Sequence, residues 1–508
     1  METDKATQQP PGGDWLELAV SRAAGAPPVE GNRLLLLRDG PENFPAWLEA
    51  IASARKYVYF EMYIFRNDAT GRRFVEALAA KARQGVTVRV LHDWLGCFGV
   101  SGKIWRQLRE AGVEVRAFNP FHFTSPFGWV SRDHRKTVSV DGRVSFVSGL
   151  CIADPWAGDP AKGTPPWRDT GVQLEGPAVA DVEQAFSRAW QTVGPPLPDG
   201  ERVPREGMAA SGKTRLRVIG DEPGTVGSLR LDQTVAGVAR QTLWLTDAYF
   251  AAPPSYVQAL RAAAKDGVDV RLLIPGSSDI PALRPVSRAG FRSLLDAGIR
   301  IFEWRGPMLH AKTAVSDGRW SRVGSSNLNV ASWLGNYELD VVLDDAPFAE
   351  QMEQMFLEDL ENSTELVLAG RRMRTLTPRP RGARVRGRLR GSAGRAAAGA
   401  LRVGNTVGAA LTARRIVEGG EKRMVLVGGV VLLSLAILWA LFPRLLSVPV
   451  VAMLAWVGLA LLWRAFRLGR PQRPKGDRVL PAPPAEASPP AEASPPAQTP
   501  VERADVRG

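Results

Sequence analysis

Short apolar runs alternate with amphipathic stretches along residues 33–370, and the same order of segments occurs twice. The apolar runs are rich in aromatic and branched residues, which is typical of buried strands. In each copy an alanine-rich helix follows the first run, ends at a glycine and leads into a second strand. The matching segments are 57–65 and 243–250, 86–91 and 268–273, and 108–115 and 294–301. The pattern predicts an α/β fold of two duplicated sheet-and-helix halves that face each other.

Breaks in this pattern divide the chain of 508 residues into segments. Stretches rich in Gly and Pro interrupt the repeat, and a chain of this length exceeds what one hydrophobic core usually supports. A Pro-, Ala- and Glu-rich tail cannot bury enough apolar surface to order itself. We expect a flexible N-terminal segment (1–32), a first half (33–192), a linker (193–213), a second half (214–370), an Arg-rich segment (371–423), an apolar hairpin (424–463) and a basic, then disordered, tail (464–508).

The formal charge of +13 is concentrated in one segment. Residues 371–423 hold 15 Lys and Arg against 2 Asp and Glu, whereas residues 1–370 hold 41 against 45. Binding to nucleic acid usually requires a basic surface on the folded region, so no nucleic-acid partner is expected. Because the basic segment immediately precedes an apolar stretch, an anionic membrane surface is favoured over a plain solvated charge run.

Two uncharged apolar runs, 424–442 and 445–463, are each about long enough to cross a bilayer as a helix. The alternative is a buried hairpin in a soluble core. Basic residues flank both outer ends, which places both ends in the cytoplasm. The N-terminus lacks the pattern of a secretory signal, and two cysteines are too few for a disulfide framework. The sequence therefore predicts a C-terminal transmembrane helical hairpin that anchors a cytoplasmic catalytic region.

The chemistry of the chain centres on His-x-Lys-x4-Asp, which occurs once in each half, at His134, Lys136 and Asp141 and at His310, Lys312 and Asp317. The Asp-Gly at the end of each copy is a hairpin turn signal, so the preceding residues form a strand. On a strand, residues two apart point to one face, which presents an imidazole beside an ammonium group. Asp141 and Asp317 fall at the turn, where a structural and a catalytic role both remain open.

The strand after each motif ends in small and polar residues, 324–327 in the second half and 148–151 in the first. Hydroxyl and amide groups beside a cation suit a phosphate, which needs positive charge and several hydrogen bonds. Taken together, these residues resemble the phospholipase D superfamily, and within it the bacterial cardiolipin synthase-like phosphatidyltransferases, over roughly residues 33–365. The resemblance also includes Asp93, the segment 167–178 and the segment 335–338.

This resemblance implies that the two halves form one catalytic unit, and it implies a reaction and a role for each residue. One motif histidine attacks phosphorus to give a phosphohistidine, the other protonates the leaving alcohol, and no metal or other cofactor is required. His134 is interpreted as the nucleophile and His310 as its partner. Candidate phosphate-binding groups are Lys136, Lys312, Ser148, Ser326 and Asn327, and candidate orienting carboxylates are Asp169 and Glu338.

Cys151 departs from the family pattern, which commonly has Asn at this position. Because a thiol is a weak hydrogen-bond donor, either the first half makes fewer phosphate contacts or its activity is reduced. His92 and His122 are interpreted as structural. The aromatic insertion around His122, residues 118–129, could line an approach for acyl chains or fill a surface gap.

The resemblance and the anchor together favour transfer of a phosphatidyl group, for example joining two phosphatidylglycerols into cardiolipin with release of glycerol. Phospholipid and an anionic membrane surface are the expected partners, and the bacterial inner membrane is the expected location. Two alternatives remain. The first is hydrolysis of a phosphodiester by the same covalent route, and the second is a non-catalytic membrane scaffold.

Overall fold

The computed structural model describes residues 13–121, 130–201, 204–279, 283–369 and 372–375, together with short helical stretches and single positions between 430 and 462. Its first half contains strands β1 (Val29–Arg38), β2 (Tyr57–Met62), β3 (Thr87–Asp93), β4 (Glu114–Phe118), β5 (Lys136–Val140), β6 (Val144–Ser148) and β7 (Thr170–Glu175). Its helices are α1 (Gly13–Ala24), α2 (Asp39–Ser53), α3 (Ala69–Arg83), α4 (Gly102–Glu110), α5 (Asp154–Ala157) and α6 (Val179–Thr192).

The second half repeats this order with its own elements. The strands are β8 (Thr214–Asp221), β9 (Thr242–Thr246), β10 (Asp269–Pro275), β11 (Arg300–Trp304), β12 (Thr313–Ser316), β13 (Trp320–Gly324), β14 (Glu338–Asp344), β15 (Ser363–Ala369) and β16 (Arg372–Thr375). The helices are α7 (Gly227–Val238), α8 (Pro254–Lys265), α9 (Leu283–Leu295), α10 (Val330–Leu334) and α11 (Ala346–Glu361).

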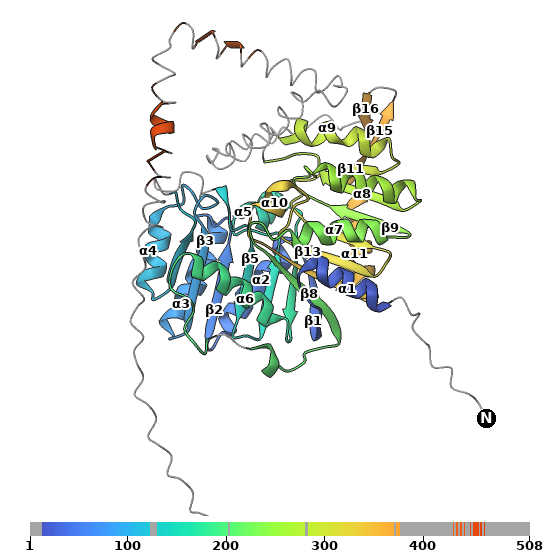
Figure 1. The fold of residues 1–508 in the computed structure, drawn as a ribbon. Coiled ribbons are helices and arrows are strands. Elements are labelled where there is room, and N and C mark those ends of the chain that lie inside the picture. The colour runs from blue at the N-terminus through green and yellow to red at the C-terminus, as the bar shows by residue number, and fades with distance from the viewer. Residues whose placement is uncertain are drawn as a thin grey trace, which may run out of the picture.

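The described strands form one hydrogen-bonded series in which the two halves have the same strand order (Figure 1). The first half runs β4-β3-β2-β5-β6-β7-β1 and the second runs β11-β10-β9-β12-β13-β14-β8. The halves meet where β1 pairs antiparallel with β8. Strands β2, β3 and β4 are parallel to one another, as are β9, β10 and β11. The predicted α/β fold of two related halves is therefore confirmed.

The predicted helix ends at Gly85 and Gly267 are also present. Both glycines have positive φ, +87° and +96°, a conformation that costs glycine little and that commonly ends a helix. Helix α3 begins with a matching signal, because the Asp68 carboxylate accepts a 2.9 Å hydrogen bond from the N–H of Gly71. The helix-to-strand units of the duplication thus have local causes in the sequence.

Three main buried clusters hold the fold together. One lies between the first sheet and α2, α3 and α4, and a second lies between the second sheet and α7, α8 and α9. The third joins the halves, because Val147 and Val172 of β6 and β7 share it with Val323 and Val341 of β13 and β14. Helices α6 and α11 also contribute to this shared cluster. The two sheets are therefore fixed against each other by buried apolar surface, which is the main stabilising contribution in folding.

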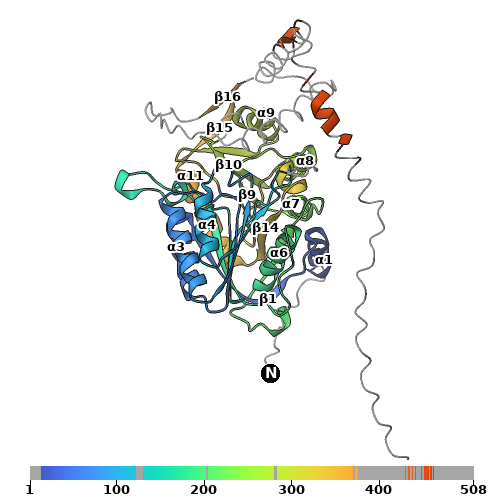
Figure 2. The same cartoon turned by 90° about the vertical axis from the view of Figure 1, so that its left-hand side faces the viewer.

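Part of the N-terminal segment differs from the prediction. Residues 13–32 were expected within a flexible stretch, but they form α1 and the start of β1. Helix α1 lies against α7 (Figure 2), and Ala24 is buried in the core of the second half. Glu17 on α1 also pairs with Arg217 on β8. Contacts with residues two hundred positions away order a segment whose overall composition is polar.

Most of the predicted transmembrane hairpin, 424–463, lies outside the described residues. Within the described part of the chain, no helix combines the length and the apolar character that a membrane span requires.

The strand order brings the two motifs to matching positions. Strand β5 is antiparallel to β2, so its first residue, Lys136, pairs with Met62 at the carboxyl end of β2. In the same way Thr313 of β12 pairs with Thr246 at the carboxyl end of β9. His134 and His310 precede these strands, and both therefore lie at the carboxyl edge of the parallel strands. In open α/β sheets this edge is where ligands usually bind.

Candidate active site

Each motif histidine is held by the backbone of the opposite half. The N–H of His134 donates to the carbonyl of Tyr337 at 2.9 Å, and the N–H of Tyr337 donates to the carbonyl of Arg132 at 2.8 Å. The second histidine repeats this arrangement, since the N–H of His310 donates to the carbonyl of Arg168 at 2.7 Å. These short bridges fix the two histidine segments relative to the two carboxylate segments.

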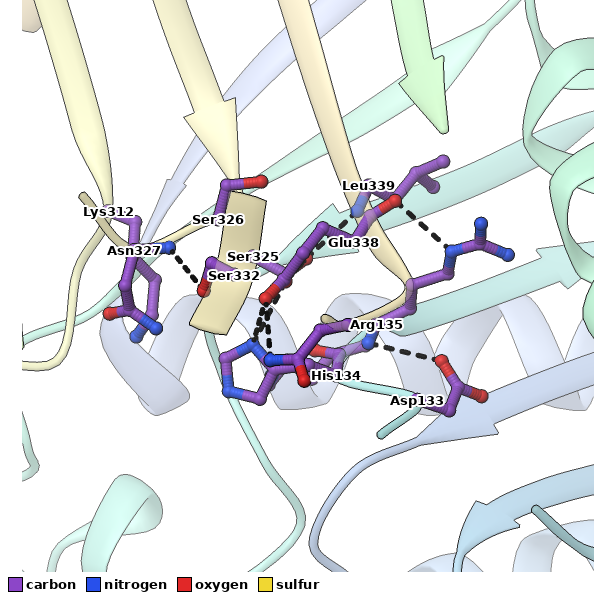
Figure 3. Close-up of polar contacts among 12 residues, drawn as sticks. Asp133, His134, Arg135, Lys312, Ser325, Ser326, Asn327, Ser332, Glu338 and Leu339 are labelled. Atoms are coloured by element: carbon purple, nitrogen blue, oxygen red, sulfur yellow. Dashed lines mark hydrogen bonds and ion pairs between the residues drawn. The ribbon is translucent and has the colours of Figure 1, made fainter. Parts of the chain in front are cut away.

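The side chain of each motif histidine also contacts a carboxylate of the opposite half. Nδ1 of His134 lies 2.9 Å and 3.0 Å from the two carboxylate oxygens of Glu338, which begins β14 of the second half (Figure 3). Nδ1 of His310 lies 2.7 Å from Oδ2 of Asp169, just before β7 of the first half. The structure thus brings both predicted carboxylates to the histidines, and each half supplies the partner for the other half's imidazole.

Other side chains hold the two carboxylates in turn. Ser325 Oγ donates to Glu338 at 2.6 Å, and Asn336 donates to it at 3.2 Å. Asp169 instead accepts from Nε1 of Trp156 at 2.9 Å. The first-half counterpart of Ser325 is Gly149, where an added Cβ would lie 2.1 Å from a carboxylate oxygen of Asp169. Sequence reasoning did not identify Trp156, because its indole reaches the site only through the fold.

Each lysine contacts the histidine of its own motif. Nζ of Lys136 donates to the carbonyl of His134, and Nζ of Lys312 donates to the carbonyl of His310. Nζ of Lys312 also lies 2.9 Å from Nδ1 of His310. Burial lowers the pKa of Lys312 to about 8, with Asp169 acting in the opposite direction, and burial likewise lowers the pKa of Lys136. At neutral pH, Lys312 remains mostly protonated and supplies positive charge.

Both imidazoles are neutral in the free protein. Burial lowers the pKa of His134 to about 4 and that of His310 to about 3, although Glu338 and Asp169 raise them. The ammonium group of lysine cannot accept a hydrogen bond. Nδ1 of each imidazole therefore carries a proton and donates it in a hydrogen bond to the carboxylate beside it. Nε2 of each ring then carries a lone pair, as a nucleophile or a general base requires.

The predicted phosphate-binding residues divide into two groups. Oδ1 of Asn327 and Oγ of Ser326 are both buried with no hydrogen-bond partner among the described residues, and the backbone N–H of Asn327 donates to Ser332 at 3.2 Å. Ser326 instead places its backbone N–H 3.2 Å from Asp340, and its hydroxyl points away from the imidazole of His134 (Figure 3). Ser148 accepts from the N–H of Leu150 at 3.2 Å, so it holds the turn after β6. Of the three, Asn327 is the best placed to contact a ligand through its side chain.

Cys151 is fully buried, and burial raises the pKa of its thiol, while the charge of Lys136 acts against this shift. The thiol therefore remains protonated at neutral pH. A neutral thiol beside a lysine adds little to phosphate binding, which fits the weaker donor expected at this position.

Asp93 positions the chain before His134. Its Oδ2 accepts from the N–H of Asp133 at 3.0 Å, and its Oδ1 lies 3.3 Å from Arg132. His92 stacks on Trp105 with ring centroids 4.0 Å apart, which agrees with a structural role. His122 and most of the insertion at 118–129 lie outside the described residues.

Asp141 and Asp317 lie at the far end of the motif strands. With roughly 3.3 Å per residue, the separation of seven positions between each histidine and its aspartate spans about 20 Å. Each carboxylate accepts hydrogen bonds of 2.8–2.9 Å from three consecutive backbone N–H groups, those of Arg55, Lys56 and Tyr57 or those of Arg240, Gln241 and Thr242. Both aspartates also have positive φ, 57° and 52°, as the turn requires. Of the two roles left open by the sequence, the geometry supports the structural one.

Replacing Asp141 or Asp317 by alanine is expected to destabilise the fold and to leave the chemistry intact. Loss of a charged acceptor for three N–H groups should cost about 2 kcal/mol of the free energy of unfolding. Thermal unfolding and kcat would be measured on both variants, with Asp141→Asn as a milder control that keeps one acceptor oxygen. A large fall in kcat at unchanged stability would contradict the structural role.

Comparison with known proteins agrees with this arrangement. The family described as "Cardiolipin synthase, PLD-like domain" matches residues 47–154 and 235–360. The chain is 33% identical to cardiolipin synthase A of Pseudomonas fluorescens, covering 68% of this chain and 72% of that protein. It is 30% identical to cardiolipin synthase 1 of Bacillus anthracis, covering 68% and 70%. The crystal structure of phosphatidylserine synthase from Haemophilus influenzae has the same fold, with a TM-score of 0.54 at 14% identity over 69% of this chain and 92% of that one.

Proposed function

This chain belongs to the family of cardiolipin synthases with phospholipase D-like domains, and we propose that it joins two phosphatidylglycerols into cardiolipin and releases glycerol. The observation that carries the proposal is the crossed pair of neutral histidines, each oriented by a carboxylate of the other half. Two such groups can share the work of attack and proton transfer on one phosphorus.

In the first proposed step, Nε2 of His134 attacks the phosphorus of one phosphatidylglycerol. The bond between phosphorus and the glycerol oxygen breaks, and His310 gives its Nε2 proton to that oxygen. Glycerol leaves, and the phosphatidyl group remains on His134. A bound phosphodiester carries a negative charge, which raises the pKa of the buried imidazoles, so that His310 takes up one proton on Nε2 when substrate binds while His134 stays neutral as the nucleophile.

In the second step, His310 removes the proton from a hydroxyl group of a second phosphatidylglycerol. The resulting oxygen attacks phosphorus, the bond between phosphorus and His134 breaks, and cardiolipin is released. Lys136, Lys312 and the amide of Asn327 are proposed to hold the phosphoryl oxygens, because preorganised donors stabilise the charge that develops there. Asp169 and Glu338 are proposed to stabilise each imidazole when it is positively charged.

We further propose that residues 424–463 anchor the protein in the bacterial inner membrane as two spans, with the Arg-rich segment 371–423 at the anionic surface. The proposal rests on the two uncharged runs and their basic flanks. Described side chains in this region, such as Leu433 and Leu454, are apolar and exposed, which suits a lipid environment. Removal of residues 424–508 should release the protein from the membrane fraction, and retention there would count against the anchor.

The reaction can be tested with purified protein and phosphatidylglycerol labelled in its glycerol headgroup. We expect cardiolipin and free glycerol in equal amounts. Phosphatidic acid with glycerol and no cardiolipin would contradict the transferase proposal and favour hydrolysis, and no turnover of any phosphodiester would favour a scaffold.

A further inference from the structure

Several large apolar side chains are exposed close to the histidines. Phe98 is 46% exposed and Val130 is 39% exposed, both in the first half, and Val330 and Leu334 on α10 of the second half are 37% and 48% exposed. We call these four residues the apolar rim. Isolated exposed apolar residues are ordinary, but several on segments that adjoin one site indicate an interaction surface.

The loop with Phe98 is tied directly to the site. Oδ1 of Asp93 accepts from the N–H groups of Leu95 and Gly96 at 2.9 Å and 2.8 Å, which begins the turn that leads to Phe98. Oδ2 of the same carboxylate accepts from Asp133, the neighbour of His134. One buried carboxylate therefore fixes both the Phe98 loop and the histidine segment.

Val130 and Leu334 belong to two segments that are also joined. Ser131 Oγ, next to Val130, donates to the carbonyl of Gly335, next to Leu334, at 2.6 Å. Two residues further along, the backbone of Arg132 and Tyr337 is bridged at 2.8 Å. The rim thus takes residues from both halves, on segments joined to those that carry His134 and Glu338.

The rim continues toward the C-terminal apolar segment. Phe121 lies close to the Val130 segment, because Asn119 donates to the carbonyl of Ser131 at 2.8 Å. The ring of Phe121 contacts that of Trp456, with centroids 5.9 Å apart. Described neighbours of Trp456, such as Leu454, expose apolar side chains as well. An aromatic contact therefore links the segment beside the rim to the segment proposed as the membrane anchor.

We propose that the apolar rim docks on the surface of a phospholipid bilayer, so that a lipid can pass from the bilayer to the two histidines without crossing water. This inference rests on the proposed function, because it requires a substrate with acyl chains. A bilayer fits better than a protein partner, since the proposed substrate is a phospholipid and Phe121, close to the Val130 segment, contacts Trp456 of the segment proposed as the membrane anchor. Lys103, exposed at the start of α4 beyond the Phe98 loop, adds charge suited to anionic headgroups.

The kinetic test uses Phe98→Asp and Leu334→Asp in the full chain with two forms of phosphatidylglycerol. We expect turnover in vesicles to fall at least tenfold, because a carboxylate at the rim opposes docking. Turnover of monomeric short-chain phosphatidylglycerol should stay within twofold of the unmodified protein. Equal losses on both substrates, or no loss in vesicles, would overturn the proposal.

Val238→Asp is the matched control. Val238 is 39% exposed, like Val130, but it ends α7 next to the Arg240 amide that binds Asp317, at the opposite edge of the sheet from His310. This variant should behave as the unmodified protein with both substrates. A tenfold loss in vesicles for Val238→Asp would show that any added charge impairs the vesicle assay, and the docking proposal would then fail.

A second measurement does not depend on catalysis. A fluorophore placed through Phe98→Cys or Val238→Cys is read in vesicles that contain nitroxide-labelled acyl chains, and the native Cys97 and Cys151 are buried. Quenching at position 98 and none at position 238 supports docking, even if the protein turns over no phospholipid and the proposed function fails. Absence of quenching at position 98 would overturn the proposal. So would a change in the fluorescence at position 98 that depends on protein concentration in the absence of vesicles, because it would show that this surface binds a second copy of the protein.

Discussion

His134→Ala and His310→Ala should each lower the formation of cardiolipin by at least about 10⁴-fold, since catalytic groups that act as a unit lose most of their effect when one is removed. Without His134 the phosphatidyl group has no nucleophile to hold it. Without His310 the glycerol leaves without a proton and the second alcohol has no base. Labelled phosphatidylglycerol gives the rate, and thermal unfolding verifies that each variant is folded.

A phosphatidyl ester of 4-nitrophenol separates the two roles, because nitrophenolate leaves without a proton. His310→Ala should still release about one equivalent of nitrophenol per protein and then stop, whereas His134→Ala should release none. The reverse pattern would exchange the two assignments, and cardiolipin formation by both variants would contradict the phosphohistidine route. His92→Ala is the matched control, because His92 is also buried but stacks on Trp105 outside the site.

Much of the fold was predictable because its causes are local. Apolar runs, helix-ending glycines and Asp-Gly turns recur in the same order in both halves, and the structure repeats the strand order accordingly. Helix α1 was missed for the opposite reason. Its residues lie in a stretch of polar, Gly- and Pro-rich composition, and its order comes from packing on α7 and from the ion pair between Glu17 and Arg217. Tertiary contacts of this kind cannot be predicted from the pattern of neighbouring residues along the sequence.

The site likewise has features with local causes in the sequence and features that depend on tertiary contacts. The spacing of His and Lys correctly brought the two groups together, but His134, His310 and Lys312 precede strands β5 and β12 and do not lie on them as predicted. Resemblance supplied the carboxylates. Neither the spacing nor the resemblance predicted that each carboxylate contacts the histidine of the other half. Glu338 and His134 are 204 positions apart and meet only through the packing of the two halves. The motif also made Asp141 and Asp317 candidates for catalysis, although their carboxylates bind the amides that begin β2 and β9.

Glu338→Gln and Asp169→Asn are expected to lower kcat by about 10²- to 10⁴-fold while the fold survives, since loss of a carboxylate partner allows the wrong imidazole tautomer. An amide can donate to Nδ1, which leaves the proton on Nε2 and removes the lone pair needed for attack. The volume of the side chain barely changes, so the shared core between the sheets should remain packed. Steady-state kinetics and thermal unfolding would measure the two effects separately.

Nitrogen NMR can show which histidine each carboxylate orients, because the chain has only four histidines. Glu338→Gln should change the tautomer of His134, in the other half, and leave that of His310 unchanged, whereas Asp169→Asn should do the opposite. The carboxylates also raise the pKa of the imidazoles they face. Glu338→Gln should therefore lower the pKa of His134 below about 4, and Asp169→Asn should lower that of His310 below about 3. Either substitution acting on the histidine of its own half would refute the crossed arrangement. If the cross is correct, neither half has a complete histidine-carboxylate pair of its own, and catalysis requires both halves together.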